Sequence, residues 1–424
     1  MSERQPIPPL YFDEDKGDYF MRFTEDEDFA KLGKADAKMH LRRLGLDDND
    51  RIKGITEIEC EFVRAQIKRR VQYVGPLAGY RSGDFRTSAG DLVLVTRGVS
   101  PARPERGKWA FLQKFITQLL PEPVQQDRFI YWLANSYRAL VNGTFSPGQC
   151  LVLIGPSQCG KNFAQTLITE LFGGRVARPY EWFIGETAFN GELAQCEHWM
   201  ISDERGSTDI RTRRAFGNAI KRAVAEQMLR VHPKGRQAIT VERTFRRVTI
   251  SCNEEPENVQ VLPPLDDSIL DKLIVLKCSA AELSSDYGKN MKQLRAELPA
   301  MAYYLTKVDV PKELAKGRFS LEAYQHPEIV SLLYEQAPEF RLMSLIDEVC
   351  WQGQSGDDRA PWTGTAVQLE KELRKSEFGN QVQSLVTFSA AVGTYLARLS
   401  QKRPERVQQR RTSTARSWVI TPPV

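Results

Sequence analysis

A short stretch of the sequence has the residue types and spacing of a phosphate-binding loop. The apolar run from Leu151 to Ile154 is followed by the pattern G-x-x-x-x-G-K, which ends at Lys161. Glycines at both ends let the backbone turn with positive φ, so that successive N–H groups point at phosphate oxygens. We expect these residues to bind a nucleoside triphosphate: Gly155, Pro156, Ser157, Gln158, Cys159, Gly160, Lys161 and Asn162. The alternative is a chance glycine-rich turn before a buried helix.

The residues after this loop predict a helix whose first turn lies under the phosphates. Apolar residues recur at helical spacing from Asn162 to Phe172, and a helix N-terminus favours an anion. Asn162 stands where a Ser or Thr hydroxyl would bind Mg²⁺. Its amide oxygen is a hard but longer ligand. We therefore expect ATP and a weakly held Mg²⁺ as cofactors.

Two acidic residues, Asp203 and Glu204, follow the apolar segment His198 to Ser202. We expect this segment to be a strand next to the one that leads into the loop. Asp203 would then hold Mg²⁺ through a water molecule, and Glu204 would be the general base for the attacking water. The alternative is an acidic strand end at the edge of a sheet.

A third predicted strand, Val248 to Cys252, ends in Asn253. An amide at a strand tip near the γ-phosphate would orient the hydrolytic water by hydrogen bonding. An ordinary turn is the alternative, since Asn before Glu-Glu-Pro is common in turns.

Residues 228–248 alternate between apolar and polar types on both sides of His-Pro-Lys-Gly, which predicts a β-hairpin with a tight turn. His232, Lys234 and Arg236 would lie at its tip. These side chains suit the backbone of a nucleic acid. The alternative is a hairpin with ordinary surface charges.

Composition narrows the class of protein. The chain has 424 residues, enough for about three domains, and seven cysteines without any C-x-x-C pair, which argues against a zinc site and a disulfide framework. It has no apolar run of about 18 residues and no segment shaped like a signal peptide. We therefore expect no membrane partner and a cytoplasmic location.

The net charge of +5 is concentrated near the C-terminus. Residues 402–416 hold six basic residues and one acidic residue, so the rest of the chain is neutral. Helical patterns over 325–401 followed by two short β-segments favour a winged helix. Its recognition helix, about 387–401, would enter the major groove, and Arg410 and Arg411 near the wing tip would contact phosphates. A solvated tail and a protein-docking module are the alternatives.

These motifs, in this order, resemble those of the superfamily 3 helicases of the AAA+ class, of the phage and genomic-island primase-helicase type. The matching segments are GPSQCGKN, MISDE, VHPKGRQ and TISCN, within about 148–278. The resemblance implies a hexameric ring that hydrolyses ATP between subunits and moves one DNA strand with its hairpin tips. The resemblance implies that ATP is bound and hydrolysed by Lys161, Asp203, Glu204 and Asn253. It also implies that DNA is contacted by His232 and Lys234.

The sequence departs from that family at two further places. Where the family commonly supplies an arginine to the neighbouring subunit, before the last strand, this chain has Lys272, which keeps the charge but loses the bidentate fork. Arg246 or Arg247 is an alternative for that role. A primase half is not evident ahead of residue 100, so a separate primase is an expected partner.

We therefore predict an α/β protein with an AAA+ type P-loop ATPase core, a parallel sheet, a helix-rich N-terminal domain and a C-terminal winged helix. The expected segments are an acidic arm (1–28), an N-terminal accessory domain (29–108), a helical pair (109–147), the core with a helical link (148–314) and the winged helix (325–424). The expected function is an ATP-dependent helicase or translocase, acting on single-stranded and duplex DNA to start replication of a phage-like element. The alternative is an ATP-binding switch that recognises DNA or a partner and hydrolyses little ATP.

Overall fold

The computed structural model describes residues 7–24, 27–49, 51, 54–144, 146–202, 210–259, 261–263, 267–335, 337–352, 359–411 and 416–423. The chain forms two compact units, Met1–His326 and Pro327–Val424. The finer division into five segments stays a prediction.

A sheet of six parallel strands is the centre of the first unit, which confirms the predicted α/β class. Its order is β15-β14-β8-β13-β10-β9. The strands are β8 (Cys150–Ile154), β9 (Val176–Ala177), β10 (His198–Ser202), β13 (Arg247–Cys252), β14 (Leu273–Lys277) and β15 (Tyr324–Gln325). β8 is buried along its whole length, as expected of a parallel strand covered on both faces.

The strand order differs from the prediction at one point. β13 pairs with β8 on one side and with β10 on the other, so the strand before Asp203 is not the neighbour of the loop strand, and that prediction is wrong. Sequence order does not determine strand order in a sheet with crossover connections. The carboxyl ends of β8, β13 and β10 nevertheless meet at one edge, because the strands are parallel.

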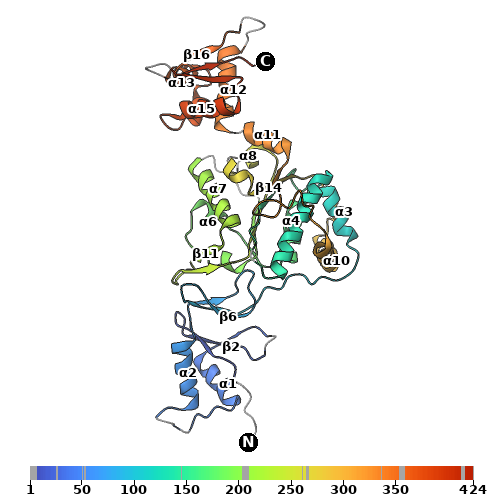
Figure 1. The fold of residues 1–424 in the computed structure, drawn as a ribbon, viewed down its shortest axis with the longest axis vertical. Coiled ribbons are helices and arrows are strands. Elements are labelled where there is room, and N and C mark those ends of the chain that lie inside the picture. The colour runs from blue at the N-terminus through green and yellow to red at the C-terminus, as the bar shows by residue number, and fades with distance from the viewer. Residues whose placement is uncertain are drawn as a thin grey trace. The chain divides into compact units, whose positions relative to one another are not determined.

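Helices cover both faces of this sheet (Figure 1). One face holds α3 (Ala110–Leu119), α4 (Pro123–Val141), α5 (Lys161–Leu171) and α10 (Tyr287–Lys307). The other holds α6 (Tyr180–Ile184) and α7 (Ile210–Ala225). Shorter helical segments are η1 (Leu193–Gln195), α8 (Pro256–Val259) and α9 (Asp267–Leu270). Residues that alternate along β10 and β13 therefore face different sets of helices.

The region before the core contains two small sheets. The first has the order β3-β2-β1-β4, and the second has the order β5-β7-β6. The elements are β1 (Tyr11–Asp13), β2 (Asp18–Met21), β3 (Ala30–Leu32), α1 (Lys34–Arg43), α2 (Glu57–Lys68), β4 (Arg70–Val71), β5 (Tyr73–Gly75), β6 (Gly83–Arg86) and β7 (Leu92–Val95). Part of the predicted acidic arm is thus built into a sheet, because its aromatic residues Tyr11 and Tyr19 are buried.

The predicted hairpin is present. β11 (Met228–Val231) pairs antiparallel with β12 (Ile239–Glu242), and Val231 is opposite Ile239. Residues 232–238 connect the two strands, which is a longer connection than the predicted tight turn.

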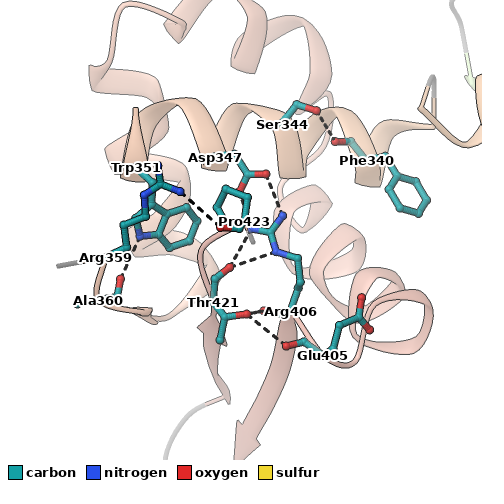
Figure 2. Close-up of polar contacts among 10 residues, drawn as sticks. All are labelled: Phe340, Ser344, Asp347, Trp351, Arg359, Ala360, Glu405, Arg406, Thr421 and Pro423. Carbon is teal, nitrogen blue, oxygen red and sulfur yellow. Dashed lines mark hydrogen bonds and ion pairs between the residues drawn. The ribbon is translucent and has the colours of Figure 1, made fainter. Parts of the chain in front are cut away.

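The second unit packs helices against an antiparallel sheet with the order β16-β18-β17. Its elements are α11 (Pro327–Glu335), α12 (Pro338–Trp351), β16 (Trp362–Gly364), α13 (Ala366–Lys375), α14 (Gly379–Leu385), α15 (Ala391–Lys402), β17 (Val407–Arg411) and β18 (Arg416–Ile420). Figure 2 shows how Arg406 ties the sheet to α12, by donating to the carboxylate of Asp347 at 2.6 and 2.9 Å and to the carbonyl of Thr421.

Within the ranges given above, none of the helices has both the length and the apolar character needed to cross a membrane.

Candidate active site

The loop between β8 and α5 takes the predicted positive φ at one of its two glycines, Gly160, but not at Gly155. Gly160 caps α5 with φ +110°, a left-handed conformation that favours glycine. A Cβ at Gly155 would overlap the backbone carbonyl of Cys278, so this position also requires glycine. Gln158 takes a positive φ of 58°. The chain therefore curls tightly between the end of a buried strand and the start of a helix.

The amine of Lys161 lies inside this curl. It donates to the carbonyls of Gly155 at 2.8 Å and Pro156 at 2.6 Å, and to the side-chain oxygen of Asn253 at 3.0 Å. Lys161 is only 5% exposed. Two residues singled out separately in the sequence, on β8–α5 and after β13, are thus brought into direct contact.

A layer of buried polar side chains joins α5 to the sheet. Gln165 donates to the carbonyl of Ile201 at 3.1 Å and to the hydroxyl of Thr249 at 2.9 Å. The hydroxyl of Ser251 shares its one hydrogen between the side-chain oxygen of Gln165 at 3.1 Å and the amide oxygen of Asn162 at 3.2 Å. The first turns of the loop helix are therefore tied to β13 and to β10.

His198 extends this layer, which we call the α5 polar layer (Asn162, Gln165, Thr169, His198, Thr249 and Ser251). Its two ring nitrogens lie 2.7 Å from the hydroxyl of Thr169 and 2.8 Å from that of Thr249. Burial lowers the pKa of His198 to about 3, so the ring is neutral at pH 7. This layer was not predicted from the sequence, although polar residues at every second position of the otherwise apolar strand β13 were a signal for it.

Asp203 and Glu204 lie outside the described residues. The strand that precedes them is held by the α5 polar layer, because Gln165 binds the carbonyl of Ile201. Their roles as metal ligand and general base stay predictions.

Lys272 lies just before β14, with its amine bound to the carbonyl of Ser268 at 2.5 Å and to the carboxylate of Asp271 at 2.6 Å. The two alternatives for the trans-acting cation are buried. Arg247 binds Ser136 at 2.7 Å, and Arg246 binds the carbonyl of Ala223 at 2.6 Å. Both guanidinium groups are therefore engaged by partners within the chain.

The hairpin residues differ in their surroundings. Lys234 is exposed. His232 is half-buried, with its backbone N–H bound to the side chain of Asn190 at 2.7 Å. Arg236 pairs with the buried carboxylate of Asp13 at 2.6 Å and is itself 13% exposed. The structure therefore places Arg236 in a contact with β1 rather than at an open tip, because a buried carboxylate needs a cation.

In the second unit, Arg410 and Arg411 are exposed at the end of β17, opposite Ser417 and Arg416. Two other members of the basic segment are paired. Arg406 binds Asp347, and Lys402 binds Glu339 at 2.9 Å. The charge that the sequence places in one cluster is thus divided between structural pairs and an exposed strand end.

Comparisons with known proteins show the fold. No protein-family model matches the chain, and no curated protein matches it. The apo structure of the NrS-1 C terminal region matches with a TM-score of 0.58 and 11% identity, over 98% of this chain and 96% of that chain. The A form apo structure of that region matches with a TM-score of 0.55 and 12% identity, over the same shares.

A third solved structure, of the SCCmec type IV Cch active helicase, covers 94% of this chain and 73% of that chain at 10% identity. Its TM-score is 0.32, which is too low to show a shared fold. The first two structures establish that the NrS-1 region and this chain share an architecture along nearly their whole lengths.

Proposed function

We propose that this protein is an ATP-dependent DNA helicase or translocase that acts as a ring. The observation that carries the proposal is the contact between Lys161 and Asn253 at 3.0 Å. It joins a cation in a glycine-bounded loop to a strand-end amide, at the sheet edge where nucleotides bind in α/β folds. A triphosphate in the loop would then meet both groups at its γ-phosphate.

Each group has a distinct task in hydrolysis. The N–H groups of the loop and of the first turn of α5 would hold the phosphates. The amine of Lys161 would exchange its carbonyl partners for phosphate oxygens, and Asn253 would orient the attacking water. In the proposed mechanism Glu204 accepts the proton of that water.

The residues present fit a magnesium ion of the kind that accompanies ATP. Asn162 carries an amide oxygen on the first turn of α5, near the strand end, where it already accepts a hydrogen bond from Ser251 at 3.2 Å. Asn162 and Asp203 would hold the ion, which would neutralise charge on the phosphate oxygens.

The DNA contacts of the proposal come from two places. His232 and Lys234, between β11 and β12, would touch one strand inside a hexameric ring, with Lys272 reaching the neighbouring subunit's nucleotide. The second unit has the element order of a winged helix, with α15 as the recognition helix and Arg410 and Arg411 on the wing, and would bind duplex DNA. We propose a role in starting replication of a phage-like element, with a separate primase.

A second candidate function is an ATP-binding switch with little hydrolysis. Two observations favour it. Asn162 is engaged by Ser251, and the amine of Lys272 is bound by Ser268 and Asp271 of its own chain. Both side chains would have to leave these partners before they could take part in ATP hydrolysis.

Native mass measurement with ATP, combined with turnover measured with and without a forked DNA, separates the two candidates. A sixfold assembly whose turnover rises with DNA supports the motor. Tight ATP binding without turnover, with or without DNA, selects the switch. No ATP binding at all overturns both.

A further inference from the structure

A small pocket lies on the face of the sheet opposite α5. Its volume is about 120 Å³, and its walls come from α6, β10, the carboxyl end of α7 and the hairpin strand β11. We call it the α7 pocket, defined by Trp182, Trp199, Arg222, Glu226, Met228 and Arg230. None of these residues belongs to the ATP site or to the hairpin tip.

One wall of the α7 pocket is aromatic. Trp182 meets Trp199 edge to face, with ring centroids 5.9 Å apart. Trp199 is buried, whereas Trp182 is partly exposed, and Met228 beside them is 53% exposed. Unpaired bases stack on aromatic rings that are open to solvent, and a methionine thioether makes favourable contacts with aromatic rings.

The other wall is cationic. Arg222 and Arg230 are exposed, and no ion pair joins either side chain to another described residue. Beneath them Arg246 lies 5.7 Å from the Trp199 ring centroid and caps the end of α7 through the carbonyls of Ala223 and Glu226. Three arginines thus stand against one acidic side chain, Glu226.

The basic surface continues along α7, which contains no acidic residue. Arg211, Arg214, Asn218 and Arg222 are exposed and are separated by three, four and four residues. This spacing puts them on one face of the helix, over a length of about 16 Å at about 1.5 Å per residue. A basic row of this kind has the charge to attract a nucleic acid backbone, and it ends at the aromatic α7 pocket.

We propose that the exposed face of α7 and the α7 pocket bind single-stranded nucleic acid, with a base on Trp182 and Met228 and its phosphates on Arg222 and Arg230. The inference rests on the proposed function. It assigns the strand a second contact area, at the base of the β11–β12 hairpin. A duplex cannot use the pocket, because its bases are stacked on one another.

The test measures binding of a fluorescent oligo-dT to the full chain over a range of salt concentrations. Removing two phosphate contacts with Arg222→Gln and Arg230→Gln should lower the slope of log K against log salt by about 1.4. Trp182→Ala should weaken binding by about 5- to 150-fold without changing that slope, and Trp182→Phe should restore most of the loss. Arg43→Gln with Arg81→Gln, two exposed arginines in the same unit, is the matched control.

Basal ATP turnover and thermal unfolding should be unchanged in the double arginine variant. If the wild type does not bind oligo-dT, the proposed function fails first. If the wild type binds and the arginine variant keeps the wild-type slope, the α7 site is overturned while the proposed function stands. If only Trp182→Ala has no effect, the pocket does not hold a base, and the proposal of a single-strand site is overturned in favour of a plain anion-binding face.

Discussion

The loop around Lys161 and the strand end at Arg410 and Arg411 both present cations, but in opposite settings. Lys161 is 5% exposed and already holds three oxygen partners. Arg410 and Arg411 are exposed, and no ion pair joins them to another described residue. A buried, prearranged cation acts at close range in a low dielectric, whereas an exposed one is screened by water and salt.

Basic residues that are close together in the sequence can therefore have different roles in the structure. Arg406 and Arg410 are four residues apart, yet Arg406 is partly buried and binds Asp347 and Thr421 (Figure 2). Arg410 has its side chain in solvent. Substitutions of buried cations should therefore have large effects that persist at high salt, whereas substitutions of exposed cations should have small effects that depend on salt.

The largest effect should follow Lys161→Ala. Loss of a prearranged charge at the γ-phosphate should lower ATP turnover by about 100-fold or more, and the loss should persist at high salt. Steady-state ATPase assays at two salt concentrations measure it. Lys292→Ala, an exposed lysine on α10, is the control, and a Lys161→Ala protein with wild-type turnover would remove the loop from the active site.

His198, another buried group of the first unit, should make the stability of the protein depend on pH. Its pKa is lowered to about 3 by burial, against about 6.5 in an unfolded chain. Below pH 6.5 the imidazole of His198 binds a proton in the unfolded chain but not in the folded chain. The free energy of unfolding should therefore fall by up to about 1.4 kcal/mol per pH unit as the pH drops.

Denaturant unfolding between pH 7 and 5 measures this slope. His198→Gln should be less stable at pH 7 but should lack that part of the slope, and His40→Gln should keep it. An identical pH dependence in wild type and His198→Gln would contradict the burial argument.

In the second unit, Arg406→Gln should lower the free energy of unfolding by about 1–2 kcal/mol, because it breaks a partly buried bidentate pair. Arg403→Gln is the matched change, since its partner Glu405 is 3.7 Å away and both are well exposed. It should cost at most about 0.5 kcal/mol. An equal loss of unfolding free energy in the two variants would contradict the conclusion that Arg406 has a structural role and Arg403 does not.

The smallest effect on the molecule itself should come from Arg410→Gln with Arg411→Gln. Thermal unfolding should not change, while the salt slope of duplex binding should fall by about 1.8. Fluorescence anisotropy with a labelled duplex measures the slope. A wild-type slope in the double variant would favour a protein-docking role for the second unit.

Much of the candidate site could be predicted from residue order. The glycines, Lys161, the strand before Asp203 and the strand before Asn253 follow from local patterns, because glycine spacing and apolar runs report backbone conformation directly. The α5 polar layer is different. Gln165, Thr249 and His198 are ordinary residues until the fold places them together, and the burial of Arg246 and Arg247 is equally a matter of packing.

The sequence by itself indicated the four longer strands of the core sheet, where the loop turns, and that the sheet is parallel; it did not indicate β9, β15 or the strands in residues 7–24. Only the tertiary structure decided that β13 lies between β8 and β10, that Lys161 meets Asn253, and that Asp13 holds Arg236. The physical reason is range: backbone preferences act over a few residues, whereas strand order and charge pairing join residues up to 223 positions apart through burial that no local pattern encodes.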